Sequence, residues 1–211
     1  MQPHSSRRAP GASLLASALT EARLAGRGGQ GVVTAGELLG TAVLRSGRHA
    51  QSLPTFGPER RGALAQCTLR VSDQPIRLKC STARPSVLVC LDPTIWRHAP
   101  ITLGLREGAV LVVNTKQDAG ALESELRSGR FPSTLPVEHC TVHTLDATGI
   151  ALEAIGRPIS NTAMLGAVAG VTGLVGLADL EDVLRERFGP KGEANVAAAR
   201  AAFEAVGGGT V

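Results

Sequence analysis

The sequence contains a glycine-dense turn whose residue types suit the binding of an anion. Glycines at 26, 28 and 31 match the spacing G-x-G-x-x-G in the run Gly26-Arg27-Gly28-Gly29-Gln30-Gly31. In this pattern one glycine permits a tight turn, one lets the backbone approach a phosphate, and one lets the following helix pack closely on its strand. The N–H groups at the helix start would then face the ligand. The same glycines also fit a plain strand-to-helix turn, so both interpretations stay open.

A second segment of unusual composition is the loop Leu53-Pro54-Thr55-Phe56-Gly57-Pro58-Glu59-Arg60-Arg61-Gly62. Two prolines and two glycines give such a loop a defined shape, and loops of this kind often carry function. Arg60 and Arg61 could bind a phosphate or carboxylate through two parallel hydrogen bonds each. The alternative is an ordinary surface turn in which Glu59 pairs with a neighbouring arginine.

The position that would hold a ribose in an NAD site lacks an acid. Such a site usually places Asp or Glu about 20 residues after the glycines, where this chain has Gln51 and Ser52. The nearest acid, Glu59, comes later in the proline-rich loop. The sequence also has no Tyr, no Ser-x-x-x-Lys arrangement and no well-placed catalytic His. A free-standing NAD(P)-dependent dehydrogenase is therefore the alternative hypothesis, and a scaffold without ligand is a third.

The cysteines and histidines do not form a metal-binding pattern. Four cysteines occur without a C-x-x-C pair, so neither an iron–sulfur run nor a zinc site is expected: Cys67, Cys80, Cys90 and Cys140. We expect them to be reduced and mostly buried, as in a cytoplasmic protein. His139 and His143 share one face of an expected strand, but no third ligand is spaced to join them. A structural or solvent-facing role is favoured over a metal site.

Composition excludes several classes of partner. The chain has 211 residues, a net charge of +4, one Trp, four Phe and no Tyr. Mild positive charge suits a phosphorylated small molecule or an acidic partner subunit, whereas few aromatics argue against base-stacking and hence against nucleic acid. No apolar run is long enough to span a membrane, so no membrane association is expected.

The N-terminal region differs in composition from the rest. Residues 1–20 are rich in Ser, Arg, Pro and Ala, with Arg7 and Arg8 ahead of the apolar stretch 14–19. An export signal could have this form, but the apolar run is very short, and a flexible extension or a mis-set start codon is the better account. We expect one α/β domain at 21–206 and a flexible tail at 207–211.

Periodicity predicts a Rossmann-like, mostly parallel sheet flanked by helices, with an antiparallel hairpin. Strands are expected at 21–25, 49–53, 86–91, 109–114 and 138–145, and the hairpin between 65–71 and 76–79. The runs 86–91 and 109–114 are continuously aliphatic, as in strands buried on both faces. Helices are expected at 32–44, within 116–129, from 148, at 160–170, 179–188 and 193–206.

Three residues at element ends leave alternatives open. Asp92 and Asn114 directly follow the two aliphatic strands, where open α/β sheets present their ligand sites. Asp92 also suits an N-cap ahead of Pro93. Ser160 is the expected N-cap of the small-residue helix. The glycines and alanines of that helix could pack within the domain or against a partner subunit.

Taken together, these segments resemble the gamma subunit, or gamma domain, of the thiamine-diphosphate-dependent 2-oxoacid:acceptor oxidoreductases, the pyruvate:ferredoxin oxidoreductase family. The resemblance lies in the segments 26–39, 52–62, 72–76 and 161–167, and it extends over about residues 21 to 200. The glycine turn followed by Gly57-Pro58-Glu59-Arg60-Arg61-Gly62 is far more specific than either segment alone.

The resemblance implies a non-redox subunit of a larger enzyme that converts a 2-oxoacid to an acyl-CoA by oxidative decarboxylation. It implies that alpha and beta subunits hold thiamine diphosphate and magnesium, and that delta-type subunits carry iron–sulfur clusters. Electrons would pass to ferredoxin or an NAD-reducing subunit. The gamma subunit is linked with coenzyme A binding and subunit contacts.

Carried onto this sequence, the resemblance implies a cofactor site at the two loops and no catalytic or metal-binding residue. The expected coenzyme A residues are Gly26, Gly28, Gly29, Gln30, Gly31, Glu59, Arg60 and Arg61. We expect the isolated chain to be inactive. The 2-oxoacid itself would be selected mainly by residues of other subunits.

Overall fold

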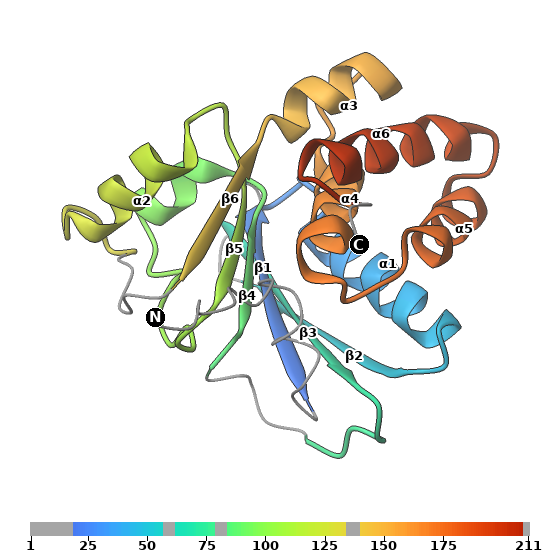
Figure 1. Cartoon of the computed structure of the whole chain (residues 1–211), viewed down its shortest axis with the longest axis horizontal. Helices are drawn as coiled ribbons and strands as arrows, with labels where there is room; N and C mark the ends of the chain where they lie inside the picture. The colour runs from blue at the N-terminus through green and yellow to red at the C-terminus, as the bar shows by residue number, and fades with distance from the viewer. Residues whose placement is uncertain (1–18, 57–61, 79–83, 134–139, 209–211) are drawn as a thin grey trace, which may run out of the picture.

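A mixed β-sheet forms the centre of the chain (Figure 1). The computed structural model describes residues 19–56, 62–78, 84–133 and 140–208, and within these ranges the sheet has six strands in the order β2-β3-β1-β4-β5-β6. Their bounds are Thr20–Arg27 (β1), His49–Phe56 (β2), Leu64–Ser72 (β3), Val87–Cys90 (β4), Val110–Asn114 (β5) and Thr141–Leu145 (β6). β1, β4, β5 and β6 are parallel, while β3 is antiparallel to both β1 and β2. The expected α/β sheet with one antiparallel hairpin is confirmed.

The hairpin itself uses a different pair of strands from the one expected. β3 pairs with β2 along eight residues, from His49 opposite Ser72 to Phe56 opposite Ala65, and the described residues 73–78 form no strand. The prediction that 76–79 pairs with 65–71 was therefore wrong. A long partner offers more backbone hydrogen bonds than a four-residue segment that begins after Pro75. Pro54 does not interrupt β2, because β2 is an edge strand, where a missing N–H is tolerated.

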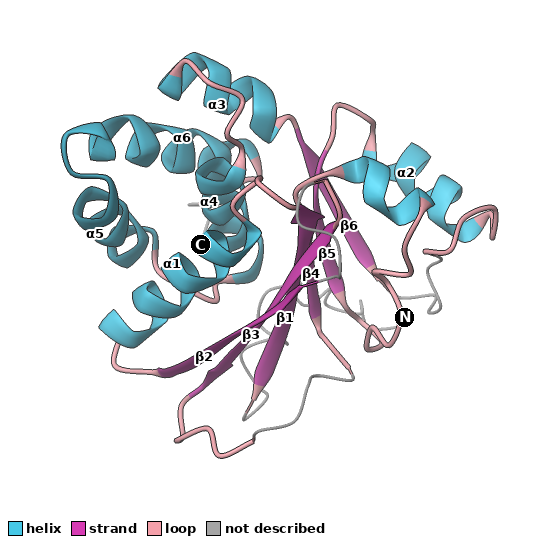
Figure 2. Cartoon of the chain, turned by 180° about the vertical axis from the view of Figure 1, so that it is seen from behind, coloured by secondary structure: helices cyan, strands magenta, loops and turns pink. Residues whose placement is uncertain are grey.

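Helices cover both faces of the sheet, on opposite sides in Figures 1 and 2. One face packs against α1 (Val32–Arg45), α4 (Asn161–Thr172), α5 (Leu177–Phe188) and α6 (Gly192–Ala205), with the short η3 (Gly189–Lys191) joining the last two and α3 (Ala147–Ile155) alongside. The other face packs against the 3-10 helix η2 (Pro93–Arg97) and α2 (Ala119–Arg127). Alternate residues of one strand enter the two cores: Val89 faces the first and Leu88 the second.

Helix α4 is buried along almost its whole length. Its small residues therefore pack within the domain and not against a partner subunit. A Cβ added to Gly166 would lie 1.8 Å from the carbonyl oxygen of Ala199 in α6. The two backbones therefore touch, and the smooth surface serves packing inside the domain. Ser160 occupies the N-cap position, but its side chain makes no capping hydrogen bond. Instead, Asn161 Oδ1 accepts from the Thr162 N–H at 2.9 Å.

A charged pair is buried in the antiparallel part of the sheet. Arg70 Nε of β3 donates to Glu21 Oε1 of β1 at 3.0 Å, and the two side chains are 1% and 9% exposed. Arg70 also donates to Gln51 Oε1 in β2 at 3.1 Å. The guanidinium thus connects three strands through one hydrogen-bonded cluster.

The remaining expectations concern the ends of the chain, the cysteines and membrane contact. Residues 1–18 and 209–211 lie outside the described residues, and β1 begins at Thr20. The proposed boundaries at 21 and 206 stay predictions. Cys67, Cys90 and Cys140 are buried, as expected, and Cys80 lies outside the described residues. Among the helices that the structure describes, none is both long enough and apolar enough to cross a membrane.

Candidate functional site

The glycine turn has the geometry that its spacing predicts. β1 ends at Arg27 and α1 begins at Val32. Gly29 and Gly31 have φ angles of +98° and +77°, which strain any residue with a side chain. A Cβ at Gly26 would lie 2.6 Å from Val32 Cγ2, so this glycine permits the close strand–helix packing. A Cβ at Gly29 would have no atom of the described residues within 4 Å, so these residues leave space over the turn.

Among the described residues, no side chain caps the start of helix α1 at this turn. Its N-cap is Gly31, which has no side chain to cap the helix, and its first turn carries no acidic residue. The first N–H groups of an α-helix have no partner within the helix. Together with the positive end of the helix dipole, they form a local site that favours an anion.

A network of side-chain hydrogen bonds connects the glycine turn to Asp92, which follows β4. The Arg27 N–H donates to Gln30 Oε1 at 2.7 Å, and Gln30 Nε2 donates to Asp92 Oδ2 at 3.0 Å. Arg27 Nε donates to the same Asp92 oxygen at 3.1 Å. Gln30 is one of the predicted cofactor residues, and the structure places its side chain inside the turn. Its contribution is therefore to set the shape of the backbone around it.

Asp92 combines the two roles that the sequence left open. Its Oδ1 accepts from the Thr94 N–H at 2.9 Å and from Thr94 Oγ1 at 2.6 Å, so it is the N-cap of η2. Its Oδ2 anchors the glycine turn. Burial alone would raise the pKa of the Asp92 carboxyl, but hydrogen bonds from Thr94 and Gln30 and the charge of Arg27 lower the pKa below its ordinary value. The carboxylate is thus ionised at neutral pH.

The second predicted loop returns to the glycine turn. Gly28 N–H donates to the carbonyl oxygen of Ala63 at 2.8 Å, and Arg27 Nη1 donates to the carbonyl oxygen of Gly62 at 3.0 Å. Glu59, Arg60 and Arg61 lie outside the described residues. The structure therefore brings the end of their loop to the turn, while the positions of these three side chains stay a prediction.

Asn161 is a neighbour of the turn that sequence reasoning did not single out. A Cβ at Gly31 would lie 2.5 Å from Asn161 Nδ2, so the amide at the head of α4 sits directly against this glycine. The carboxyl ends of β1 and β4, which are adjacent in the sheet, likewise explain why Asp92 meets the turn. The contact between Asp92 and the turn could have been predicted from the strand order. The contact between Asn161 and Gly31 depends on the path of α4 across the sheet, for which the sequence carries no local signal.

The residues at the expected ribose position serve the sheet instead. Gln51 Oε1 accepts from Arg70, as described above, and Ser52 Oγ lies 3.1 Å from Cys67 Sγ. Asn114 likewise has a structural role, since its Nδ2 donates to the Leu91 carbonyl oxygen at 2.9 Å and to Thr148 Oγ1 at 3.0 Å. All three side chains are therefore engaged in contacts within the domain.

The histidine pair is only partly described. His143 lies in β6, where burial lowers the pKa of its imidazole, and His139 lies outside the described residues. Within the part of the chain that the structure describes, no group of three or more His, Cys, Asp or Glu side chains is arranged to hold a metal ion.

Comparison with known proteins identifies the family. The family model described as pyruvate ferredoxin/flavodoxin oxidoreductase matches residues 21–205. The common gamma subunit of the pyruvate/ketoisovalerate oxidoreductases of Thermococcus kodakarensis is 42% identical over 186 residues, covering 88% of this chain and 96% of that protein. Pyruvate synthase subunit PorC of Methanothermobacter marburgensis is 43% identical over 187 residues, covering 88% and 97%.

A solved structure of a member of this family also matches the chain. The pyruvate oxidoreductase subunit PORC of Thermotoga maritima superimposes with a TM-score of 0.75 at 34% identity, covering 89% of this chain and 97% of that one. The resemblance drawn from the glycine turn and the loop after it is confirmed. The chain therefore belongs to the pyruvate ferredoxin/flavodoxin oxidoreductase family, in which it is similar along nearly its whole length to gamma-type subunits.

Proposed function

We propose that this chain is the gamma subunit of a thiamine-diphosphate-dependent 2-oxoacid:acceptor oxidoreductase complex and that it contributes coenzyme A binding and subunit contacts. The complex would decarboxylate a 2-oxoacid oxidatively to an acyl-CoA. The names of the relatives support this, since they are subunits of pyruvate and ketoisovalerate oxidoreductases and of pyruvate synthase. Thiamine diphosphate, magnesium and iron–sulfur clusters would be held by alpha, beta and delta-type partners, and electrons would pass to ferredoxin or to an NAD-reducing subunit.

One observation supports coenzyme A binding most directly: the glycine turn and the second loop are joined. The hydrogen bond from Gly28 N–H to Ala63 O brings the end of the arginine-containing loop to the uncapped start of α1. Backbone donors and a helix dipole at the start of α1 suit a diphosphate, and we propose that the guanidinium groups of Arg60 and Arg61 add their charge to this site. The open space over Gly29 would admit it.

The residues fit this ligand in distinct ways. Gly29 and Gly31 would present backbone, and Gly28 would join the second loop to the turn, because its N–H donates to the Ala63 carbonyl oxygen. Arg60 and Arg61 would supply charge, with Glu59 orienting them. Gly26 and Gln30 would act through the turn, because the first permits its packing and the second ties it to Asp92. When bound, coenzyme A supplies the thiol that accepts the acyl group.

Calorimetry on the full-length chain and on the assembled complex tests the proposal. We expect coenzyme A to bind the complex, and we expect the isolated chain not to bind NAD tightly. We also expect the chain alone to show no iron–sulfur absorbance and no 2-oxoacid oxidation. Tight NAD binding by the chain alone, or oxidation of a 2-oxoacid by it, would refute the proposal. A complex that uses coenzyme A normally while this subunit is omitted would do the same.

A further inference from the structure

A cleft of about 640 Å³ opens where five helical segments meet, beside the glycine turn. Its floor and walls come from the first turn of α1, the connection between α3 and α4, the start of α4, the end of α5 and the η3–α6 junction. This volume lies in the range of sites for small organic ligands, about 300–1,000 Å³. The lining residues are Thr34, Ile155, Arg157, Ile159, Asn161, Arg187, Phe188, Pro190, Lys191, Ala194 and Asn195.

Three cations line the cleft, and none of its described lining residues is acidic. Within the described residues, Arg157, Arg187 and Lys191 take part in no ion pair, whereas other arginines of the same helices do. Arg185 Nε lies 2.8 Å from Glu193 Oε1, and Arg200 Nη2 lies 2.7 Å from Glu181 Oε1. The cleft therefore brings together three cations that form no ion pair among the described residues.

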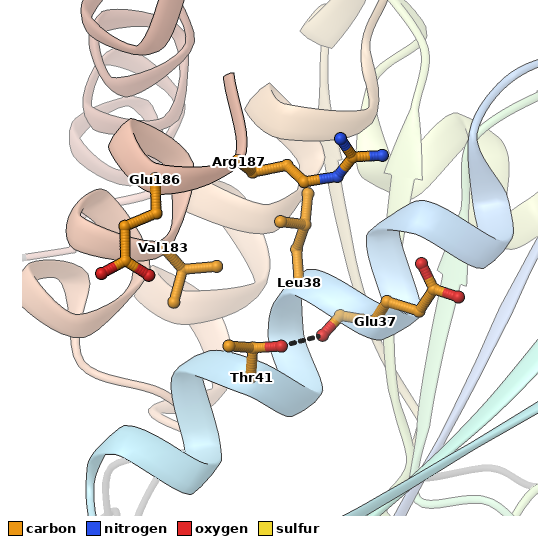
Figure 3. A pocket seen from close by; sticks show the side chains of 6 residues that line it. All are labelled: Glu37, Leu38, Thr41, Val183, Glu186 and Arg187. Carbon is orange, nitrogen blue, oxygen red and sulfur yellow. Dashed lines mark hydrogen bonds between the residues drawn. The ribbon is translucent and has the colours of Figure 1, made fainter. Parts of the chain in front are cut away.

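Arg187 illustrates why these charges stay unpaired. It also lines a smaller groove between α1 and α5, where Figure 3 shows its side chain extending away from Glu186. Glu186 is already hydrogen-bonded to Arg45 of α1. The guanidinium carbon of Arg187 lies 6.0 Å from the centre of the Phe188 ring, so its nearest described aromatic neighbour is a wall of the cleft.

The remaining walls are apolar or carry amides. Ile159 is 43% exposed although it is a large aliphatic side chain, and Phe188 and Pro190 add further apolar surface. Asn195 Oδ1 accepts from Thr162 Oγ1 at 3.2 Å and its Nδ2 donates to the Lys191 carbonyl oxygen at 2.8 Å, which fixes this wall. Cations beside exposed apolar surface suit a ligand with a phosphate at one end and a flat ring at the other.

The cleft lies next to the glycine turn. Thr34 lies in the first turn of α1, and Asn161, which also lines the cleft, sits against Gly31. A ligand held at the turn would therefore have the cleft beside it.

From this arrangement we propose that the cleft binds the phosphate and base of a nucleotide. Arg157, Arg187 and Lys191 hold the phosphate, and Ile159 and Phe188 pack against the ring. The nucleotide comes either from the adenosine bisphosphate end of coenzyme A, in which case the inference rests on the proposed function, or from a free nucleotide. An acidic segment of a partner protein is less well matched, because the charges converge in a concave space with apolar walls.

Binding of adenosine 3′,5′-bisphosphate to the full-length chain, followed by calorimetry, tests this. The double variant Arg157→Gln with Lys191→Gln removes two cations of the cleft. The control, Arg106→Gln with Arg130→Gln, removes two exposed arginines outside it. We expect the Kd to rise at least about tenfold in the first variant and to stay within about twofold of the wild type in the second. Circular dichroism melts would show whether both variants fold.

The outcomes separate the sources of the nucleotide. If coenzyme A displaces the bisphosphate, the ligand is the coenzyme; if ATP displaces it and coenzyme A does not, the ligand is a free nucleotide. Equal loss in both double variants, no binding of any nucleotide, or binding only of polyglutamate would overturn the inference. If the complex uses coenzyme A normally with Arg157 and Lys191 replaced, and the bisphosphate binds this variant as tightly as the wild type, the proposed function survives and this inference does not.

Discussion

Substituting Gly29 by alanine separates the binding role of the glycine turn from its structural role. Gly29 has a φ of +98°, and a Cβ there would meet no atom of the described residues within 4 Å. The variant therefore creates no clash with this part of the chain, but it strains the backbone by about 1–2 kcal/mol. In a domain of this size we expect the melting temperature to fall by about 2–8 °C. The added methyl also occupies the open space in which we place the phosphate.

Gly47 provides a matched control at the other end of the same helix. Its φ is +78°, and a Cβ there also has nothing within 4 Å. Gly47→Ala should cost similar stability without touching the proposed site. If Gly29→Ala removes one hydrogen bond to a charged phosphate, worth about 1.5–3 kcal/mol, the KM for coenzyme A rises about 10- to 150-fold. Because this contact is made equally in the ground and transition states, kcat changes little.

The assay is steady-state 2-oxoacid oxidation by the assembled complex at varied coenzyme A, with thermal melts of both variants. An unchanged KM in Gly29→Ala, with a stability loss equal to that of Gly47→Ala, would show that the turn only packs. Equal rises in KM for both variants would show that the effect comes from loosening α1.

Three further predictions concern the network around the site. Glu21→Ala removes the carboxylate that pairs with the buried Arg70 guanidinium, so the free energy of unfolding, measured with denaturant, should fall by about 3–5 kcal/mol. The control Glu123→Ala, in the exposed i,i+4 pair with Arg127, should lower it by less than about 0.5 kcal/mol. Equal losses in the two variants would contradict this prediction. Because the pKa of Asp92 is lowered on folding, the carboxylate stabilises the fold above its unfolded pKa of about 4, and this contribution is lost as pH falls through the folded pKa. The difference in unfolding free energy between wild type and Asp92→Asn should therefore shrink below about pH 4. A difference that does not change with pH would exclude this contribution of the ionised carboxylate. Arg60→Gln with Arg61→Gln should weaken coenzyme use or assembly of the complex while the melting temperature stays unchanged, and normal activity would remove both arginines from the site.

Local patterns in the sequence predict much of this fold. The aliphatic runs around Val87–Cys90 and Val110–Asn114 lie in parallel strands of the sheet, because a strand buried on both faces needs apolar residues at every position. The glycine turn is predictable for a similar reason, since few other residues tolerate its φ angles and close contacts. In both cases the constraint acts within a few residues.

Contacts between distant segments could not be predicted in this way. β3 pairs with β2 and not with the expected segment 76–79, because the longer strand offers more backbone hydrogen bonds, and a local pattern does not reveal which partner is longer. Asp92 meets Gln30 only because β4 lies next to β1. Arg157 precedes Arg187 and Lys191 by a whole helix pair in the sequence, so no local spacing indicates that it lines one cleft with them.

The close contact between Gly166 and Ala199 has a consequence for binding. Because the backbones of α4 and α6 touch, α4 cannot slide along its neighbour without a steric clash. Asn161 at its head is therefore fixed against Gly31 before any ligand arrives. A ligand at this boundary between turn and cleft meets a preorganised wall, and little conformational entropy is lost there on association.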